Sequence, residues 1–471
     1  MDGKEEIDLA KEKMTQEEKV TYMTTKPVQP LICELAVPTI ISMLVTAFYN
    51  MADTFFVGKI NTQSTAAIGI VFTVMALIQS CGFFFGHGTG NYISRKLGAR
   101  EYKDAEIMAA TGFFLAFICG VIFGILGLIF LDPLAVLLGS TPTILPYTRD
   151  YLRIILIGTP FMMSSFVLNN QLRFQGSASY AMVGIVTGAL VNIVLDPIMI
   201  FVFDMGVAGA ALATVLGQVI SFVMLYIGSM RGGNIRIRFK NFKPGWSSVV
   251  EIARGGFPSL CRQGLASVAG IFLNHMAGTH GGVNGDAAIA AMSIVNRVTM
   301  FANSALIGFG QGFQPVCGMN YGAKKYDRVR EGFKFCVKYA FVFLVIVAAI
   351  GFIFANPIIA LFRKDDQEVI RIGALALKMH CLAFPLSAWI VMCNMMLQSM
   401  GRAVKASIVA AARQGLFFIP LIFILPQFLG LFGVQVCQMV SDIGAFALSL
   451  PIGISELKIL KNNPKNVENA K

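Results

Sequence analysis

Charged residues are scarce in this chain: Asp, Glu, Lys and Arg make up only 14% of its 471 residues, whereas 56% are hydrophobic. A soluble protein of this length exposes far more charge, because water-facing positions are mostly polar. The scarcity therefore excludes an ordinary soluble protein and favours a chain that lies mostly in a membrane. The 46 Gly agree with this interpretation, since small residues allow membrane helices to approach one another closely.

Residues that carry chemistry in enzymes are also few. The four His (His87, His275, His280 and His380) show no metal-ligand or nucleophile–base spacing, and the nine Cys include no CxxC pair. The chain has no GxxxxGK[ST] phosphate loop either, so we expect no ATP hydrolysis within it. We therefore expect neither an enzyme nor a bound cofactor, and we interpret the Cys as small apolar packing residues.

Twelve apolar runs are long enough to cross a bilayer, for which a helix needs about 20 residues. Pro and Gly inside several runs are tolerated, because neighbouring helices satisfy the freed backbone groups. The pattern predicts an all-α polytopic membrane protein. The expected spans are 31–57, 66–92, 107–131, 150–170, 180–203 and 206–228, followed by 257–277, 287–315, 334–355, 370–396, 406–427 and 433–455.

The two sets of six spans repeat one another. Short motifs recur at an offset that grows from 220, for Pro38 and Pro258, to 225, for Pro160 and Pro385. The slow, ordered growth of this offset along the chain indicates small insertions into an old duplication. Because each half has an even number of spans, we expect two pseudo-symmetric six-helix lobes related by an axis along the membrane normal, with a cleft between them. The further matches are Gly86-Gly88-Gly90 with Gly308-Gly310-Gly312, the segment 98–102 with 322–326, and Gly176 with Gly401.

This organisation divides the chain into five parts. We expect no cleaved signal peptide, because the first residues are polar and of mixed charge with no apolar run behind a basic start. In the linker we expect residues 246–256 to form a short amphipathic helix at the membrane surface. The parts are an N-terminal tail (1–29), an N-lobe (30–228), a linker (229–256), a C-lobe (257–456) and a C-terminal tail (457–471).

Basic residues in the loops orient the chain. If the N-terminus lies inside, the loops after the second, sixth and eighth spans are cytoplasmic and the opposite loops are poorer in Lys and Arg, with Arg363 and Lys364 the main exception. The positive-inside rule then predicts a multi-pass protein of the cell (plasma or inner) membrane with both termini in the cytoplasm. The net charge of +12 reflects this asymmetry, so no nucleic-acid partner is required.

Two carboxylates lie inside predicted spans, where a charge is costly and marks a functional position. Asp53 lies near the outer end of the first span and Asp196 near that of the fifth, with Asn192 on the same helix face as Asp196. We expect them to meet Thr214 and Tyr151 in the outer part of the first half. Burial disfavours a charged carboxylate, so this group could exchange a proton, or its oxygens could ligate Na⁺. The alternative is a hydrogen-bond network that only fixes helix packing.

The second half carries arginines instead of these acids. Arg297 lies about 15 Å inside the eighth span, at about 1.5 Å per residue, whereas Arg262 and Arg413 start nearer the cytoplasmic edge and could reach the headgroups. Our hypothesis is that they line a substrate cleft and pair with an anionic group or with Asp442; the alternative is packing and interhelical pairing. The candidate cleft residues are Arg262, Gln263, Arg297, Gln311 and Arg413.

One stretch carries a family resemblance. Asn192-Ile193-Val194-Leu195-Asp196-Pro197 is followed by Gly206-Val207-Ala208-Gly209-Ala210-Ala211-Leu212-Ala213-Thr214. With the first span from Pro38 to Asp53 and the glycine run before Gly98-Ala99, this stretch resembles the multidrug and toxic-compound extrusion (MATE) family, over nearly the whole chain after the tail.

The resemblance implies a V-shaped pair of six-helix lobes and antiport of cationic or amphipathic compounds against H⁺ or Na⁺. It implies a helix bend at Pro38 and an ion network in the N-lobe. A glutamate that one branch of the family carries in the seventh span has no counterpart in 257–263, so coupling through the N-lobe is favoured. The implied ion-coupling residues are Asp53, Asn192, Asp196 and Thr214, with Tyr151 nearby.

The sequence thus predicts a secondary antiporter that exports amphipathic or cationic small molecules in exchange for H⁺ or Na⁺ by alternating access. We expect no cofactor beyond the coupling ion, no partner beyond the small-molecule substrate and the bilayer, and a monomer. Two alternatives stay open: a flippase for lipid-linked precursors, in which cleft arginines meet a pyrophosphate, and the efflux of an anionic or zwitterionic metabolite.

Overall fold

The computed structural model describes residues 14–364 and 366–462, and every regular element in those ranges is helical. The outermost parts of the two expected tails, 1–13 and 463–471, lie outside the described residues. The first half contains α2 (Gln16–Thr25), α3 (Val28–Val57), α4 (Thr62–Gly98), α5 (Tyr102–Ile129), α6 (Leu131–Leu137), α7 (Leu145–Phe174), α8 (Ala178–Pro197) with a π turn η1 (Ile198–Val202), and α9 (Gly206–Ser229).

The second half repeats this arrangement. Its helices are α10 (Trp246–His280), α11 (Gly285–Gly322), α12 (Tyr326–Ile353), α13 (Ala355–Phe362), α14 (Gln367–Ala383) continued by α15 (Ser387–Ser399), α16 (Ala403–Ala411) continued through a π turn η5 (Ala412–Phe418) into α17 (Ile419–Leu429), and α18 (Leu431–Asn462). With short helices omitted and continued helices joined, the described part contains twelve membrane-length rods, as the sequence predicted.

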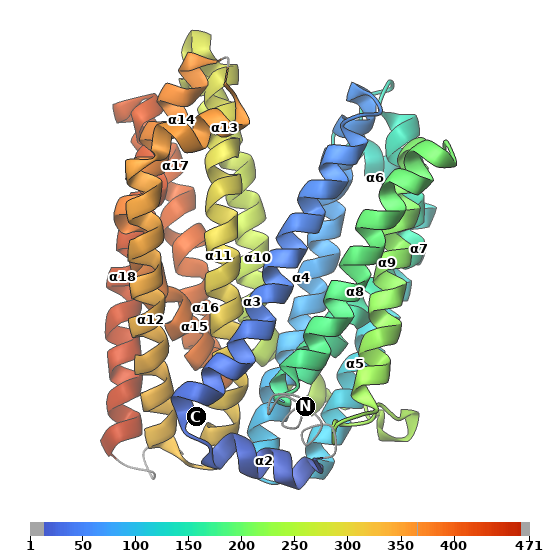
Figure 1. The fold of residues 1–471 in the computed structure, drawn as a ribbon, viewed down its shortest axis with the longest axis vertical. Helices are drawn as coiled ribbons and strands as arrows, with labels where there is room; N and C mark the ends of the chain where they lie inside the picture. Colours follow the sequence, from blue (N-terminus) through green and yellow to red (C-terminus); the bar gives the residue numbers. More distant parts are fainter. Residues whose placement is uncertain (1–13, 365, 463–471) are drawn as a thin grey trace, which may run out of the picture.

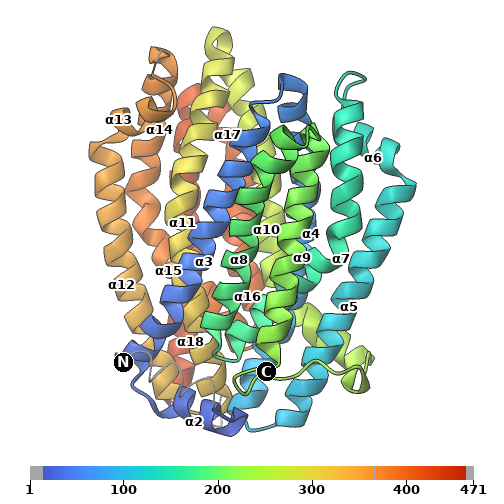
Figure 2. The same ribbon diagram turned by 45° about the vertical axis from the view of Figure 1, so that its right-hand side comes forward.

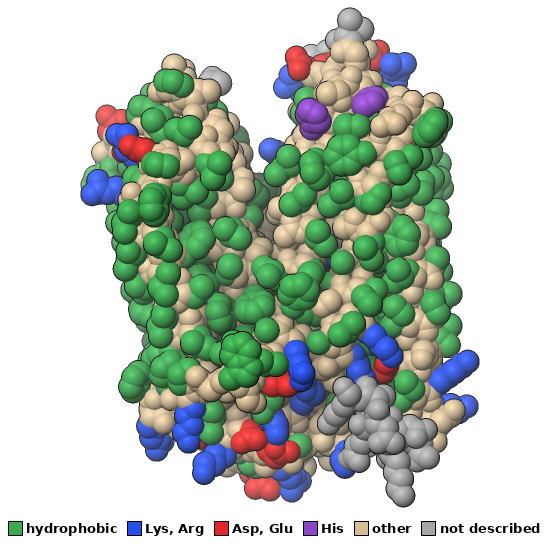
Figure 3. Space-filling model, turned by 180° about the vertical axis from the view of Figure 1, so that it is seen from behind, with side chains coloured by type: hydrophobic (Ala, Val, Ile, Leu, Met, Phe, Trp, Pro, Cys, Tyr) green, Lys and Arg blue, Asp and Glu red, His purple; other side chains and the backbone are tan. Residues whose placement is uncertain are grey.

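The rods form two lobes that diverge like a V (Figure 1). Helices α3 to α9 make the N-lobe and α10 to α18 the C-lobe. We call the end that carries α2 the closed end, because the lobes meet there, and the opposite end the open end. The space-filling view shows the hollow between the lobes at the open end (Figure 3). The predicted two-lobe fold is therefore confirmed.

Composition explains which helices face which surroundings. Ten helical rods are long and apolar enough to cross a membrane, and hydrophobic side chains cover the flanks of both lobes (Figure 3). Along α5 the exposed apolar residues recur at helical spacing, for example Ile118, Ile122, Ile125 and Ile129. The two membrane-length rods outside this set are α10 and α11. Both lie on the side of the C-lobe that is turned toward the N-lobe (Figure 1), where a more polar surface is tolerated.

The sequence repeat corresponds to a repeat of backbone geometry. Arg100 and Lys324, which occupy the same place in the repeated segment, both have positive φ, 61° and 59°. Gly176 and Gly401 likewise share φ values of 82° and 79°, in the left-handed region that favours glycine. Matching turns at matching positions show that the two halves repeat one local backbone geometry, in agreement with the sequence repeat.

The closed end is held together by reciprocal contacts between the repeats. A Cβ on Gly98 would collide with the carbonyl oxygen of Met319, and a Cβ on Gly322 would collide with that of Arg95. Each glycine thus faces the backbone three residues before the other glycine. The second helix of each lobe also packs against the first helix of the other, α4 against α10 and α11 against α3.

Helix α2 lies across this end and contacts both lobes (Figure 2). Its Thr15 cap and Glu18 form a reciprocal capping box that starts the helix. Lys19 Nζ donates to Ser177 Oγ of the N-lobe and to Asn234 Oδ1 of the linker, both at 2.7 Å. On the C-lobe side, Asn320 Nδ2 donates to the carbonyl oxygen of Met23 at 3.2 Å, and Lys325 Nζ to that of Thr24 at 2.8 Å.

One sequence expectation about the linker is wrong. Residues 246–256 do not form a separate helix at the membrane surface, because they are the first turns of α10. Gly255 and Gly256 explain the difference: their missing side chains let α10 approach the backbone of α4 at Gly88 and Phe84. Gly255 and Gly256 are buried against α4, whereas Trp246 is 82% exposed, and the segment runs without a break into the rest of α10.

Candidate functional site

The N-lobe contains a buried polar group built on α8 and α9. Asn192 and Asp196 lie one turn apart on α8, and Asn192 Nδ2 donates to Asp196 Oδ1 at 3.2 Å. The same amide donates to Thr214 Oγ1 of α9 at 3.4 Å. All three side chains are almost completely buried. Pro197 and the π turn η1 follow immediately, so the regular helix ends directly beside the carboxylate.

Helices α3 and α7 complete this group. Asp53 is 9% exposed and Tyr151 is fully buried, and both lie within electrostatic reach of Asp196. The structure therefore brings together all five residues that the sequence assigned to ion coupling. Two residues were missed, Tyr49 of α3 and Gln218 of α9. Each is four residues from a predicted member, Asp53 and Thr214, which is the helical spacing that could have indicated them.

The group has free capacity for one small ion. It borders a cavity of about 20 Å³ lined by Tyr49, Asn192, Thr214 and Gln218, which is room for a single water or a bare cation. Among the described residues, one oxygen each of Asp53, Asp196 and Asn192, and the hydroxyl of Tyr151, accept or donate no hydrogen bond. Buried oxygens without partners are costly, so the geometry suits a site that takes up a proton or ligates a cation.

The C-lobe brings Arg262, Gln263 and Arg413 to one cavity of about 200 Å³. Arg413 forms a two-pronged ion pair with Asp442 of α18, with Nε–Oδ1 at 2.7 Å and Nη2–Oδ2 at 3.2 Å. Arg262 donates to Asn394 Oδ1 of α15 at 3.4 Å. Both guanidinium groups are thus held by neighbouring helices, which is the interhelical pairing that the sequence left open as an alternative.

Gln311 lies elsewhere, at the junction of the lobes. It accepts a short hydrogen bond from Arg173 of α7, whose other amino nitrogen lies 2.5 Å from Asn170 Oδ1 and 3.2 Å from His87 Nε2. Arg173 is 2% exposed, and its partners are uncharged groups. Sequence reasoning missed Arg173, because it lies in the last turn of α7, beyond the apolar run predicted to end at residue 170.

Arg297 is the member of the predicted cleft set nearest to the open end. It is exposed and lies one turn before Phe301 on α11. Phe301 packs against Phe48 of α3 with ring centroids 5.2 Å apart, so this face of α11 is turned toward the N-lobe. The structure therefore divides the predicted set of five: three residues line one cavity, Gln311 lies at the lobe junction, and Arg297 lies on the cleft wall.

Pro38 lies inside α3, where it has no N–H to donate to the preceding turn of the helix. The next residue, Thr39, donates through Oγ1 to the carbonyl of Gly308 in the C-lobe at 2.7 Å. The proline is thus adjacent to an inter-lobe contact. A bend of α3 at Pro38 stays a prediction.

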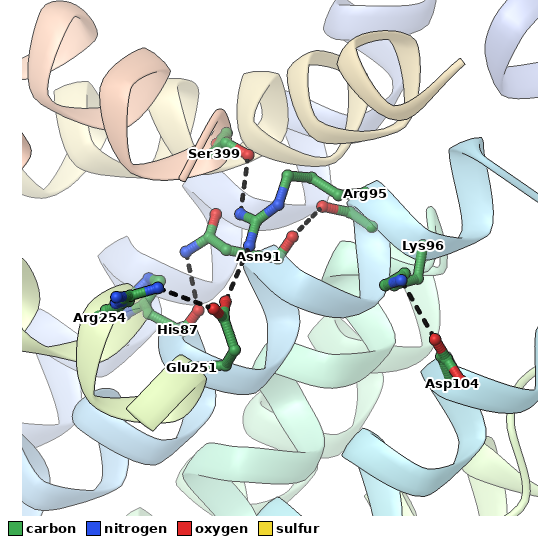
Figure 4. A network of polar contacts seen from close by, with 9 residues as sticks. His87, Asn91, Arg95, Lys96, Asp104, Glu251, Arg254 and Ser399 are labelled. Carbon is green, nitrogen blue, oxygen red and sulfur yellow. Dashed lines mark hydrogen bonds and ion pairs between the residues drawn. The ribbon is translucent and has the colours of Figure 1, made fainter. Parts of the chain in front are cut away.

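Polar contacts also connect the lobes at the closed end (Figure 4). Arg95 of α4 donates to the carbonyl of Ser399 at 3.2 Å and lies 3.8 Å from a carboxylate oxygen of Glu251 on α10. Glu251 also contacts Arg254 at 3.3 Å. These contacts would have to break before the hollow could open toward this end.

Comparisons with known proteins agree with this architecture. The MatE family model matches residues 38–198 and 258–424. The multidrug export protein MepA of Staphylococcus haemolyticus is 29% identical over 421 residues, covering 89% of this chain and 91% of that protein, and MepA of Staphylococcus aureus is 28% identical over 420 residues, covering 89% and 92%. The structure of a multidrug resistance MATE family transporter of the MOP superfamily, in an outward-facing conformation, superposes with a TM-score of 0.88 at 28% identity, covering 95% of this chain and 99% of that one.

Proposed function

The chain belongs to the MatE family of multidrug efflux transporters, and on this premise we propose that it is a secondary antiporter coupled to H⁺ or Na⁺. The exported substrates would be amphipathic or cationic organic molecules that occupy the hollow between the lobes. The observation that carries the proposal is the N-lobe group: two buried carboxylates from α3 and α8 lie within electrostatic reach of each other, and their neighbours Asn192 and Thr214 line a cavity of about 20 Å³.

Coupling follows from the energetics of this group. Two neighbouring carboxylates in a membrane interior repel each other when both are ionised, so uptake of a proton or Na⁺ stabilises their approach. Asp53 lies on α3, which also contacts the C-lobe through Thr39. Ion uptake at Asp53 and Asp196 would therefore change how α3 packs between the lobes. An ion and a substrate that favour different lobe arrangements exchange across the membrane by shifting one conformational equilibrium.

Orientation completes the proposal. The closed end carries the basic clusters of the loops, including Arg95, Lys96 and Lys325. By the positive-inside rule we place this end in the cytoplasm and the hollow toward the outside of the cell membrane. Alternating access would then require the closed-end contacts of Arg95 and α2 to separate while the lobes approach each other at the open end.

The test is efflux in vesicles with pH and Na⁺ gradients imposed separately against a panel of compounds. We expect Asp53→Asn to abolish gradient-driven efflux while the protein still inserts and binds substrate. The matched control is Asp132→Asn, because Asp132 is an exposed acid that pairs only with Arg149 at 2.7 Å in the described part of the chain. Normal driven efflux by the Asp53 variant would refute this coupling site.

A further inference from the structure

Arg262 is a membrane-embedded cation without an acidic partner among the described residues. It lies 16 residues into α10, and its guanidinium donates a hydrogen bond to the neutral Asn394 Oδ1 at 3.4 Å. The neighbouring Arg413 differs, since Asp442 neutralises it through two hydrogen bonds. Arg262 is half-buried, and a guanidinium without a counter-charge is costly wherever the low dielectric medium does not replace its hydration.

The surroundings add a second positive charge. Arg173 lies within electrostatic reach of Arg262. The remaining polar groups on the cavity wall are amides: Gln263, Asn303, Asn394 and Gln414. Amides can donate hydrogen bonds to an anion but supply no negative charge. This part of the C-lobe therefore has a net positive character that the described protein groups leave uncompensated.

The cavity beside Arg262 has the dimensions of a ligand site. Its volume is about 200 Å³, and an apolar cavity of about 150 Å³ holds a benzene ring. One wall is apolar, with Ala266, Ile307, Ile390 and Val409. The combination of a cation, several amide donors and an apolar wall suits a molecule with an anionic head and a hydrophobic body.

Local backbone geometry supports a specialised site. Arg413 and Gln414 lie on the π turn η5, which widens the helix between α16 and α17. Such turns occur frequently at functional positions, because they redirect side chains out of the regular helical array. The equivalent rod of the N-lobe carries its own π turn, η1, directly after Asp196. Each lobe thus has a π turn beside its charged group, and the two groups have opposite sign.

We propose that this C-lobe cavity binds the anionic head of an amphipathic organic substrate, a carboxylate or a comparable oxyacid group, with Arg262 as the pairing cation. The amide side chains donate to the head and the apolar wall contacts the body. For transport this inference rests on the proposed function, and it extends the substrate class from cations to anionic or zwitterionic molecules. As a statement about binding it stands alone.

The test compares three ligands of one shape at equilibrium, with purified protein in phosphatidylcholine nanodiscs and isothermal titration calorimetry. The ligands are 2-naphthoate, the neutral 2-naphthamide and the cationic 2-naphthylmethylammonium. We expect naphthoate to bind at least about tenfold more tightly than the amide, the difference that a charge-assisted hydrogen bond of about 1.4 kcal/mol gives. Equal or tighter binding of the amide or the ammonium would overturn the proposal.

Variants locate the site. Arg262→Gln should remove the preference for naphthoate, Arg262→Lys should keep part of it, and Arg371→Gln should leave it unchanged, because Arg371 is an exposed arginine that pairs with Glu368. A preference that survives Arg262→Gln would refute the assignment. If that variant does not fold, Gln263→Leu removes an amide from the same wall and should weaken naphthoate binding several-fold; unchanged affinity would count against the site.

Two further measurements are needed. One distinguishes a substrate anion from a lipid headgroup, and the other distinguishes the anion-binding proposal from the ion-coupling proposal. Naphthoate affinity should be the same in nanodiscs with and without phosphatidate, whereas displacement by phosphatidate would assign the cavity to a lipid headgroup and overturn the substrate assignment. Asp53→Asn should bind naphthoate normally, since no gradient is present. Failure of ion coupling at Asp53 and failure of anion binding at Arg262 are therefore distinguishable.

Discussion

Replacing Lys19 by Met tests how α2 is held at the closed end. Lys19 lies outside the membrane-spanning segments and is 9% exposed, and burial lowers the pKa of its ammonium group from 10.5 to about 7. Its partners, Ser177 Oγ and Asn234 Oδ1, are neutral. Lys19 lines a cavity of about 400 Å³ at the closed end. The other ionisable residues of its lining are Tyr22, Glu34, Tyr180 and Arg231, and Glu34 is paired with Lys26 at 2.6 Å.

The direction in which pH changes the docking of α2 follows from proton linkage. Undocked Lys19 has its ordinary pKa, so it binds a proton that the docked residue has largely released above pH 7. Docking of α2 therefore weakens as pH falls from about 10 toward about 7 and changes little below that. With these two pKa values, linkage makes docking about 2–3 kcal/mol weaker at pH 6 than at pH 9. Lys19→Met cannot ionise, so its docking should not depend on pH through this residue.

The assay is hydrogen exchange of the peptide that covers α2, corrected for the intrinsic pH dependence of exchange. In the wild-type protein, protection of residues 16–25 should rise between pH 6 and pH 9 by roughly a factor of 30 to 150, the equivalent of about 2–3 kcal/mol. Lys19→Met should lose this rise, and the exposed control Lys103→Met should keep it. Constant or falling wild-type protection, or an unchanged rise in Lys19→Met, would refute the reasoning.

Two predictions concern stability, measured as the midpoint of thermal unfolding in detergent. Gly98→Ala should destabilise the protein by about 1–3 kcal/mol, because its Cβ would collide with the backbone of the other lobe, whereas Gly264→Ala, which meets open space, should be neutral or slightly stabilising; equal midpoints for the two variants would contradict the packing argument. Arg413→Met should cost about 3–5 kcal/mol by leaving the carboxylate of Asp442 buried and unpaired, and adding Asp442→Asn should restore most of the loss. A double variant no more stable than the single one would show that the pair is not the cause.

The fold and the N-lobe group could be predicted because their signals are local. Apolar runs and a repeat whose offset grows slowly can be recognised in the sequence alone. An acidic residue inside an apolar run is equally conspicuous. Asn192 and Asp196 are four residues apart, so helical geometry alone brings them together. Tyr49 and Gln218 are neutral, and a neutral polar residue in a membrane helix is too common to be distinctive without its neighbours.

The remaining features depend on tertiary distances. The sequence offered Asp442 as one possible partner for the second-half arginines, and only the packing of α18 against η5 assigns it to Arg413 and leaves Arg262 unpaired. Arg173 lies beyond the apolar run that defined its span, so it resembled a loop residue. The extension of α10 back to Trp246 accompanies the close packing of Gly255 and Gly256 against α4, a tertiary contact that the sequence of residues 246–256 does not predict by itself.

The reciprocal approach of Gly98 and Gly322 has a mechanical consequence. Main-chain atoms form both sides of that contact, and the two sides are copies of one repeated segment. Such a surface has no rotamers to rearrange, so the proposed alternating access would separate and re-form it with little reorganisation. Duplication therefore supplied more than a second lobe: it supplied a self-complementary backbone contact between the lobes.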